Sequence, residues 1–341
     1  MSKFVLDAEE ITVLKRLIDE LAATHDSSES PELLMDAAVL AHEMPRRLRA
    51  ALTHFKLSEP DPGLLIVSGY PVSDDKIGAT PEHWQRRSPA RSPTLEEEIL
   101  FVLTSSLLGE CIGWSTQQGG RIIHDVLPIK GMENEQIGTG SEQTIWWHTE
   151  DAFHALRGDY LGMLCLRNDD RVPTTFASLE QVRLDPEDRK ILFEPHFTIQ
   201  PDNSHRKQNG AQGGQDGAEA EKLYGKIEAM HRAPDKIAVL SGDPRSPYIR
   251  IDPYFMDKIE DNPRAQRALE ALAQAIDSEL KDVALEPGEI CFIDNFKAVH
   301  GRRAFKARYD GRDRWLKRIN ITRDLRKSRE ERADAVSRII L

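Results

Sequence analysis

The sequence has few cysteines, few aromatic residues and no long apolar run. Its three cysteines, scattered through 341 residues, do not suggest a disulfide framework and favour a reducing, cytoplasmic location. No segment approaches the roughly 20 consecutive apolar residues of a membrane-spanning helix, and the N-terminus has no signal-peptide pattern. We therefore expect no membrane association, with Cys111, Cys165 and Cys291 buried as small apolar groups.

Positive charge is also in short supply. The chain has 46 Lys and Arg against 57 Asp and Glu, for a formal net charge of −11. Binding to nucleic acid is not expected, because its phosphates require a basic surface. The acidic balance mildly favours a cationic or zwitterionic small molecule as the partner. Nothing in the sequence indicates an oligomeric state.

The first part of the chain, 1–113, is expected to be mainly helical. Apolar residues recur at helical spacing after Asp7, a candidate N-cap. A second helical stretch over 31–54 should be kinked or split by Pro45. A short apolar run at 63–71, bounded by Gly and Pro, predicts a core strand, and an apolar helix is expected at 95–113.

Short strands dominate the next part, 114–325. We expect them at 121–128, 160–167, 236–241, 248–252, 289–294 and 316–322. Because strands rarely alternate with helices here, the pattern favours an α+β protein with a mainly-β core. The predicted fold is a double-stranded β-helix, or jelly roll, with flanking N-terminal and inserted helices, forming a single domain over 1–341.

Two insertions and a tail complete this prediction. The polar segment 202–217 is expected to form a lid loop over the mouth of the site. The segment 262–280 has helical apolar spacing and should lie outside the core. In the tail, 326–341, alternating charges that begin at Arg323 predict a solvated helix.

The strongest chemical signal is the pair His148 and Glu150, followed much later by His300. Residues i and i+2 of an extended strand point to the same side, so the pair can face one metal while Thr149 turns away. Two imidazoles and one carboxylate are the ligands of a mononuclear iron(II) site with open coordination positions.

These residues stand in motifs that resemble a known family. The runs His-Thr-Glu-Asp-Ala-Phe (148–153) and Asp-Asn-Phe-Lys-Ala-Val-His-Gly-Arg (294–302), with Arg314 fourteen positions after His300, resemble the clavaminate synthase-like branch of the iron(II)/2-oxoglutarate oxygenases. That branch has Glu where most relatives have Asp. Further stretches at 41–49, 116–118, 125–131 and 308–325 resemble its arginine 3-hydroxylases, such as that of the viomycin pathway, over essentially the whole chain.

The resemblance implies roles for the site residues. His148, Glu150 and His300 would ligate iron(II), with 2-oxoglutarate and O2 as cosubstrates. Arg314 would bind the far carboxylate of 2-oxoglutarate, as suits a guanidinium, helped by a threonine hydroxyl. Of Thr174 and Thr175, we favour Thr175.

It also implies an amino acid substrate, hydroxylated at C3 or C4 in peptide-antibiotic biosynthesis. Arg318 would bind the α-carboxylate, Gln117 and Glu150 the amino acid head, and Asp252 the guanidinium. The chain departs from the arginine 3-hydroxylases at Tyr254, because they carry a second aspartate at that position. A tyrosine there offers a hydroxyl or a cation–π face.

This departure leaves the substrate open. Arginine remains the first choice, with enduracididine (a cyclic guanidine amino acid), citrulline, lysine or C4–C5 desaturation of arginine as alternatives. Two other classes are a zinc hydrolase using the same ligands and a non-catalytic binding module. The remaining histidines are interpreted as structural or exposed, and Trp146 and Trp147 as walls of the core.

Overall fold

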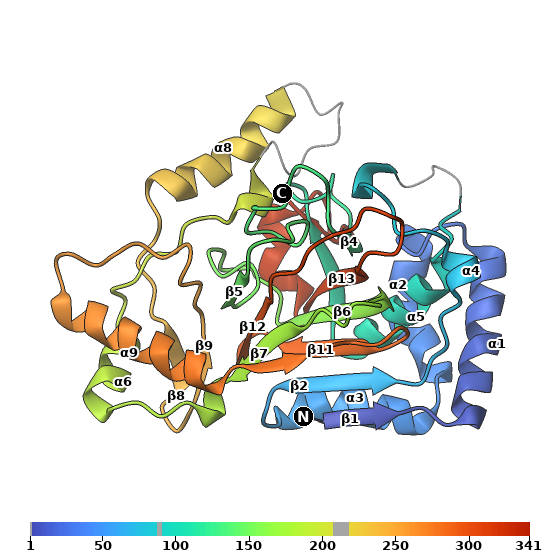
Figure 1. The fold of residues 1–341 in the computed structure, drawn as a ribbon, viewed down its shortest axis with the longest axis horizontal. Helices are drawn as coiled ribbons and strands as arrows, with labels where there is room; N and C mark the ends of the chain where they lie inside the picture. The colour runs from blue at the N-terminus through green and yellow to red at the C-terminus, as the bar shows by residue number, and fades with distance from the viewer. Residues whose placement is uncertain (1, 87–90, 207–217) are drawn as a thin grey trace.

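Two β-sheets face each other at the centre of the fold (Figure 1). The computed structural model describes residues 2–86, 91–206 and 218–341. In spatial order the larger sheet contains β1 (Ser2–Val5), β2 (Leu64–Ser68), β11 (Ile290–Asp294), β6 (Tyr160–Arg167), β13 (Trp315–Thr322), β3 (Glu110–Trp114) and β14 (Ile339–Ile340), and β4 (His124–Val126) also pairs with β13. The smaller sheet contains β10 (Lys281–Val283), β7 (Thr174–Ser178), β12 (Ala298–Arg302) and β5 (Ile145–His148); β8 (Leu240–Asp243) and β9 (Ser246–Ile249) form a separate hairpin.

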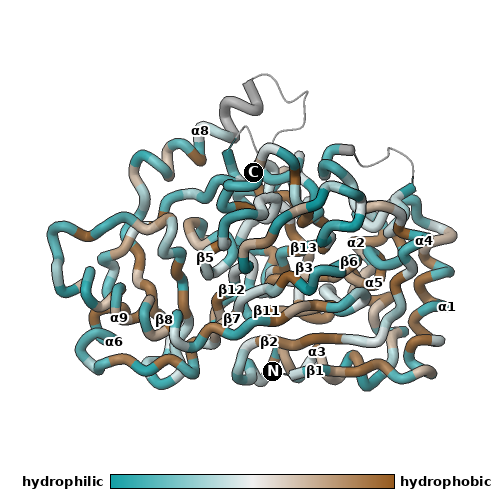
Figure 2. Tube along the Cα trace, in the orientation of Figure 1, coloured by the Kyte–Doolittle hydropathy of each residue, from teal (hydrophilic) through white to brown (hydrophobic). Residues whose placement is uncertain are grey.

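Strands at the centre of the larger sheet are apolar on both faces. Leu64 and Ile66 of β2 point toward the smaller sheet, where they share a cluster with Phe176 of β7. Leu65 and Val67 point the other way, into the cluster formed with the N-terminal helices. A strand covered on both faces has a continuous apolar run rather than an alternating one, and Figure 2 shows this run along β2.

Helices cover both outer faces of the sheet pair. Helix α5 packs against the larger sheet, with the rings of Phe101 and Phe292 6.4 Å apart. Helices α6 and α9 pack against the smaller sheet. The α-helices are α1 (Ala8–Thr24), α2 (Pro31–Leu40), α3 (Arg46–Ser58), α4 (Asp74–Ile77), α5 (Leu95–Ser106), α6 (Pro186–Leu192), α8 (Ala218–Arg232) and α9 (Pro263–Glu279). The 3-10 helices are η1 (Ala41–Glu43), η2 (Trp84–Arg86), η3 (Leu179–Gln181), η4 (Asn203–His205) and η5 (Leu325–Glu331).

Several local predictions are confirmed. Asp7 caps α1 in a reciprocal capping box with Glu10. The second helical stretch is split before Pro45, which precedes α3. The three cysteines are buried and free, and the inserted helix is α9. Within the described residues, no helix combines the length and apolar character needed to cross a membrane.

Other local predictions were wrong or concern residues that the structure does not describe. The helix expected over 95–113 ends at Ser106, because 110–114 pairs with β13 as strand β3. The tail is not a solvated helix: it forms η5 and then β14, which pairs with β3, and Arg332 is buried. Most of the expected lid, 207–217, lies outside the described residues, and helix α8 was not expected.

Candidate active site

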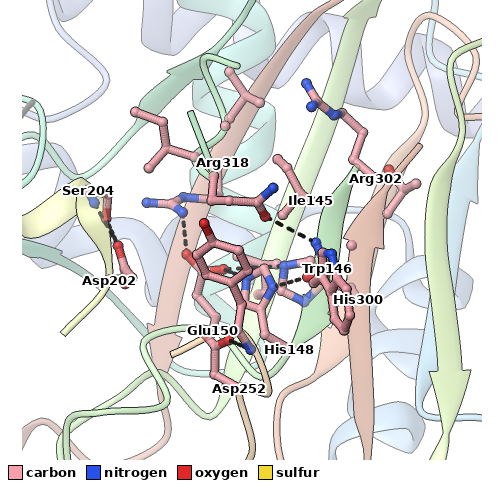
Figure 3. Close-up of a pocket in the computed structure, with 18 of the residues that line it drawn as sticks. Ile145, Trp146, His148, Glu150, Asp202, Ser204, Asp252, His300, Arg302 and Arg318 are labelled. Atoms are coloured by element: carbon pink, nitrogen blue, oxygen red, sulfur yellow. Dashed lines mark hydrogen bonds and ion pairs between the residues drawn. The ribbon is translucent and has the colours of Figure 1, made fainter. Parts of the chain in front are cut away.

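The two histidines of the predicted triad are direct neighbours across adjacent strands. His148 on β5 pairs in register with His300 on β12, and their ring centroids lie 4.6 Å apart. The Oε2 atom of Glu150 lies 3.6 Å from Nε2 of His148 and 3.3 Å from Nε2 of His300. Three donor atoms thus converge on one point (Figure 3).

Glu150 is placed by contacts beyond the strand. Because β5 ends at His148, the expectation of a single extended strand carrying both ligands was wrong. Asn295 instead holds the backbone of Glu150, accepting from its N–H at 2.7 Å and donating to its carbonyl at 3.0 Å. Thr149 does turn away, because its N–H and hydroxyl both bond to the carbonyl of Ile251.

The histidines are oriented for metal binding. Nδ1 of His148 lies 2.7 Å from the carbonyl of Trp146, which places a proton on Nδ1 and makes Nε2 the nitrogen that faces Glu150. Burial opposes protonation of His148, but the hydrogen bond to Glu150 and the charge of Asp252 outweigh it and raise its pKa to about 9. Burial lowers the pKa of His300. A divalent metal would replace the proton shared by His148 and Glu150.

Glu150 divides its two carboxylate oxygens between two tasks. Oε2 faces the histidines, whereas Oε1 accepts a hydrogen bond from Nη1 of Arg318 (Figure 3). Burial would raise the pKa of Glu150, but Arg318 and the two histidines hold it well below its usual range. The ligand set is therefore coupled directly to the arginine expected at the substrate carboxylate.

Arg314 is a buried cation without a carboxylate partner among the described residues. It is 6% exposed, its Nη2 donates to Oγ1 of Thr174 at 3.2 Å, and its Nε has no partner in the described part of the chain. Burial lowers its pKa to about 10. A buried guanidinium that lacks a carboxylate partner is suited to bind the carboxylate of a ligand.

The hydroxyl beside Arg314 belongs to Thr174, so our preference for Thr175 was wrong. Thr174 pairs with Arg302 and Thr175 with Gly301, so the two threonines point to opposite faces of the smaller sheet. Thr174 lies on the face of His300 and lines the cavity. Thr175 points to the opposite face.

The same cavity contains the two residues expected at the substrate side chain. Asp252 is 7% exposed, and burial raises its pKa to about 6 although His148 opposes this shift. Its Oδ1 accepts from the backbone N–H of Tyr254 at 3.2 Å. Tyr254 is 49% exposed and also lines the cavity, as does Trp146. Trp146 is 51% exposed, so its interpretation as core was wrong, whereas Trp147 is in the core.

Gln117 lies behind Arg318 rather than in this cavity. Its Oε1 accepts from Nη2 of Arg318 at 3.1 Å, and it lines a smaller adjoining cavity. His124 contacts the same Nη2 through Nδ1 at 2.8 Å, with its Nε2 bonded to the carbonyl of Arg121. His124 was interpreted only as structural or exposed, and the sequence carries no signal for its contact with Arg318.

A second group of titratable side chains, Asp151, Asp202 and His205, lies beside the first. Asp151 already accepts from Nε1 of Trp114 at 2.6 Å and Nδ2 of Asn320 at 2.9 Å. Because both of these neutral donors reach Oδ2 while Oδ1 faces Nε2 of His205 at 3.1 Å, this group is a hydrogen-bonded cluster. Among the described residues no neutral donor bonds to Oε2 of Glu150, so the set of His148, Glu150 and His300 fits a divalent metal.

The family model for the taurine catabolism dioxygenase TauD, TfdA family matches residues 63–320. The chain belongs to this family. The matched segment begins just before β2 and contains the histidines, Glu150, Arg314 and Arg318. The α1–α3 segment precedes it.

Relatives of known activity match nearly the whole chain. The enduracididine beta-hydroxylase of Streptomyces hygroscopicus is 46% identical over 338 residues, covering 98% of both chains. The L-ornithine/L-arginine 3-hydroxylase of Catenulispora acidiphila is 44% identical, covering 100% of both. Among solved structures, the non-haem iron oxygenase OrfP with Fe, succinate and (3S)-hydroxy-L-Arg is 41% identical over 100% of both chains, with a TM-score of 0.94. OrfP has also been solved with Fe and alpha-ketoglutaric acid.

Proposed function

We propose that the protein is an iron(II)- and 2-oxoglutarate-dependent dioxygenase that hydroxylates free L-arginine, or a closely related guanidino amino acid, at C3. One observation carries this proposal. Glu150 presents one oxygen to His148 and His300 and the other to Arg318, in a cavity that also holds Arg314 and Asp252. Two relatives that cover nearly all of the chain are an enduracididine beta-hydroxylase and an L-ornithine/L-arginine 3-hydroxylase.

In this proposal His148, Glu150 and His300 hold the iron on one side and leave its other positions open. Iron(II), 2-oxoglutarate and O2 together supply the oxidant, converting a C–H bond to C–OH while 2-oxoglutarate becomes succinate and CO2. Arg314 binds the far carboxylate of 2-oxoglutarate, and the Thr174 hydroxyl that it contacts is a second candidate ligand of that carboxylate. We also propose that the two facing sheets are the halves of a double-stranded β-helix.

The remaining polar groups hold the amino acid. Arg318 binds its α-carboxylate, while Glu150 and Gln117 orient that arginine from either side. Asp252 accepts hydrogen bonds from the guanidinium of the substrate, which places a cation beside this buried carboxylate. With both ends of the substrate held, one carbon is presented to the metal.

A cyclic guanidine amino acid such as enduracididine is the second candidate. Tyr254 stands where the arginine 3-hydroxylases have a second aspartate, so a single carboxylate, Asp252, remains for the side chain. A cyclic guanidine has fewer N–H groups to satisfy and a flat face that the Tyr254 ring can cover. The relative that is 46% identical is an enduracididine beta-hydroxylase.

The deciding experiment incubates the protein with iron(II), ascorbate and 2-oxoglutarate. Arginine, enduracididine, ornithine, citrulline and lysine are supplied separately, and product mass and succinate are measured. We expect a product one oxygen heavier than arginine or enduracididine, with hydroxyl at C3 by NMR. A product two hydrogens lighter means desaturation instead. No succinate above background with any of them would contradict the oxygenase proposal.

Tyr254→Asp tests the substrate preference separately. If arginine is the substrate, the added carboxylate should lower its KM. If enduracididine is the substrate, the exchange should raise its KM and shift the preference toward arginine. We further propose that the enzyme works in the cytoplasm, which suits its three free thiols, in the biosynthesis of a peptide antibiotic.

A further inference from the structure

His205 is buried completely although it belongs to a short 3-10 turn in a polar segment. It has 0% exposure. Its Nδ1 lies 2.6 Å from Oγ1 of Thr116, and its Nε2 lies 3.1 Å from Oδ1 of Asp151. The rings of Trp114 and Phe153 stand edge-on to the imidazole, at centroid distances of 5.5 and 4.8 Å. Burying an imidazole is favourable only where both nitrogens find partners, as they do here.

The orientation of Gln117 links this histidine to Arg318. Nη2 of Arg318 needs an acceptor and lies 3.1 Å from Oε1 of Gln117, so the amide nitrogen must face the other way. There Nε2 of Gln117 donates to Oγ of Ser204 at 2.6 Å and to Oδ1 of Asp151 at 3.3 Å, the same oxygen that faces Nε2 of His205. A continuous set of polar contacts therefore runs from Arg318 through Gln117 to residues 204 and 205.

The residues just before His205 form part of the cavity wall. Asp202 and Ser204 both line the cavity of the metal ligands, and Oγ of Ser204 donates to Oδ1 of Asp202 at 2.5 Å (Figure 3). Asp202 also caps η4 through the N–H of Ser204 at 2.8 Å. The position of this wall thus depends on how η4 is held against the core. His205 is the residue of η4 that makes a buried contact there.

We propose that His205 is a positioning residue, which fastens residues 202–206 against the cavity and orients Gln117 behind Arg318. It touches neither metal nor substrate. Its loss leaves the metal ligands in place but lets the wall and Gln117 shift, so that the amino acid is held less well. This inference rests on the proposed function only for its kinetic readouts.

The test uses His205→Ala and Thr116→Val, because the second variant removes only the contact to Nδ1. Amide hydrogen exchange should become faster in a peptide containing 202–206 in both variants, while peptides from β5 and β12 exchange as in the wild type. This readout does not require turnover. It keeps the inference testable if the wild type hydroxylates none of the amino acids supplied.

The kinetic readouts separate positioning from general damage. Losing one or two hydrogen bonds should raise the KM for the amino acid about five- to tenfold, and the ratio of hydroxylated product to succinate should fall. The KM for 2-oxoglutarate should stay within about twofold of the wild-type value. Arg314 and Thr174 are hydrogen-bonded to each other and belong to a separate set of contacts. His205→Gln places an amide near the position of the imidazole Nε2. This variant should therefore show a smaller rise in KM than His205→Ala.

His154→Ala is the matched control. His154 also packs on Trp114, at 4.7 Å, but its Nδ1 accepts from the backbone N–H of Leu156. We expect wild-type exchange over 202–206 and a wild-type product ratio in this variant. Unchanged exchange and an unchanged KM in Thr116→Val and His205→Ala would overturn the inference, as would equal effects from His154→Ala.

Discussion

His300 on β12 is the register partner of His148 on β5, so two candidate metal ligands far apart in the sequence are neighbours across one strand pair. Their backbones can come this close because the next residue is glycine. A Cβ on Gly301 would lie 2.5 Å from the carbonyl oxygen of Ile145 and 3.0 Å from the backbone nitrogen of Trp147. The separation of the two imidazoles is therefore set by the packing of β12 against β5.

Gly301→Ala should push β12 away from β5 and weaken metal binding. Such overpacking typically destabilises by about 1–3 kcal/mol, and the displaced histidine should lower affinity for a divalent metal at least about tenfold. Calorimetric titration with Mn(II) or Co(II) measures this. Gly225→Ala is the control, because no described atom outside the backbone of its own helix lies within 4 Å of its Cβ position. Equal metal affinity in the two variants would contradict the argument.

The two threonines of β7 should differ in their effect on 2-oxoglutarate. Thr174→Val removes the hydroxyl bonded to Arg314, and the loss of about 1 kcal/mol should raise the KM for 2-oxoglutarate about fivefold. Thr175→Val makes the same chemical change on the opposite face of the strand and should leave this KM near the wild-type value. A larger effect from Thr175→Val would show that the other face is the functional one.

Arginine binding should weaken as the pH falls below about 6. Burial raises the pKa of Asp252 to about 6, so below that pH the free enzyme increasingly carries a neutral carboxyl that cannot pair with a guanidinium. Affinity for arginine should then fall up to about tenfold per pH unit. Anaerobic calorimetry with arginine and with citrulline, whose side chain is neutral, checks this.

The ratio of the two affinities is the informative quantity, because effects of pH on the metal ligands cancel in it. Asp252→Asn should remove the pH dependence of the ratio. Parallel pH profiles for arginine and citrulline in the wild type would show that Asp252 does not contact the charged end.

Lys317→Met should destabilise the protein strongly. Lys317 is 1% exposed, and its Nζ lies 2.5 Å from Asp125 and 3.1 Å from Glu98. The substitution removes a cation that both buried carboxylates share, and breaking a buried ion pair by removing one partner typically costs about 3–5 kcal/mol. Urea unfolding measures the loss. Arg232→Met, at an exposed pair with Glu228, should change stability by less than about 0.5 kcal/mol.

Motifs of a few residues predicted much of the candidate metal site. His148, Glu150, His300, Arg314 and Arg318 all lie in or beside one cavity. Such motifs are informative because a ligand set requires particular side chains at particular spacings. Helix starts were also predictable, since capping at Asp7 involves residues only three positions apart.

Long-range pairing decided what these motifs could not. The register of β7 against β12 places Thr174, and not Thr175, on the face of the cavity. A shift of one residue in this register would exchange the two. The tail became η5 and strand β14 because β3 offers it an edge, although its alternating charges favoured a helix. Edges and registers depend on distant segments, and no local pattern encodes them.

The sequence by itself determined the type of chemistry, since its two histidines and glutamate indicate a metal and its motifs resemble those of the 2-oxoglutarate oxygenases. Only the tertiary structure decided how these groups act on one another. It divides Glu150 between the histidines and Arg318, and it places His124, His205 and Asn295 around the site. The physical reason is that hydrogen bonds between buried groups depend on distances of a few tenths of an ångström, which only the packed chain sets.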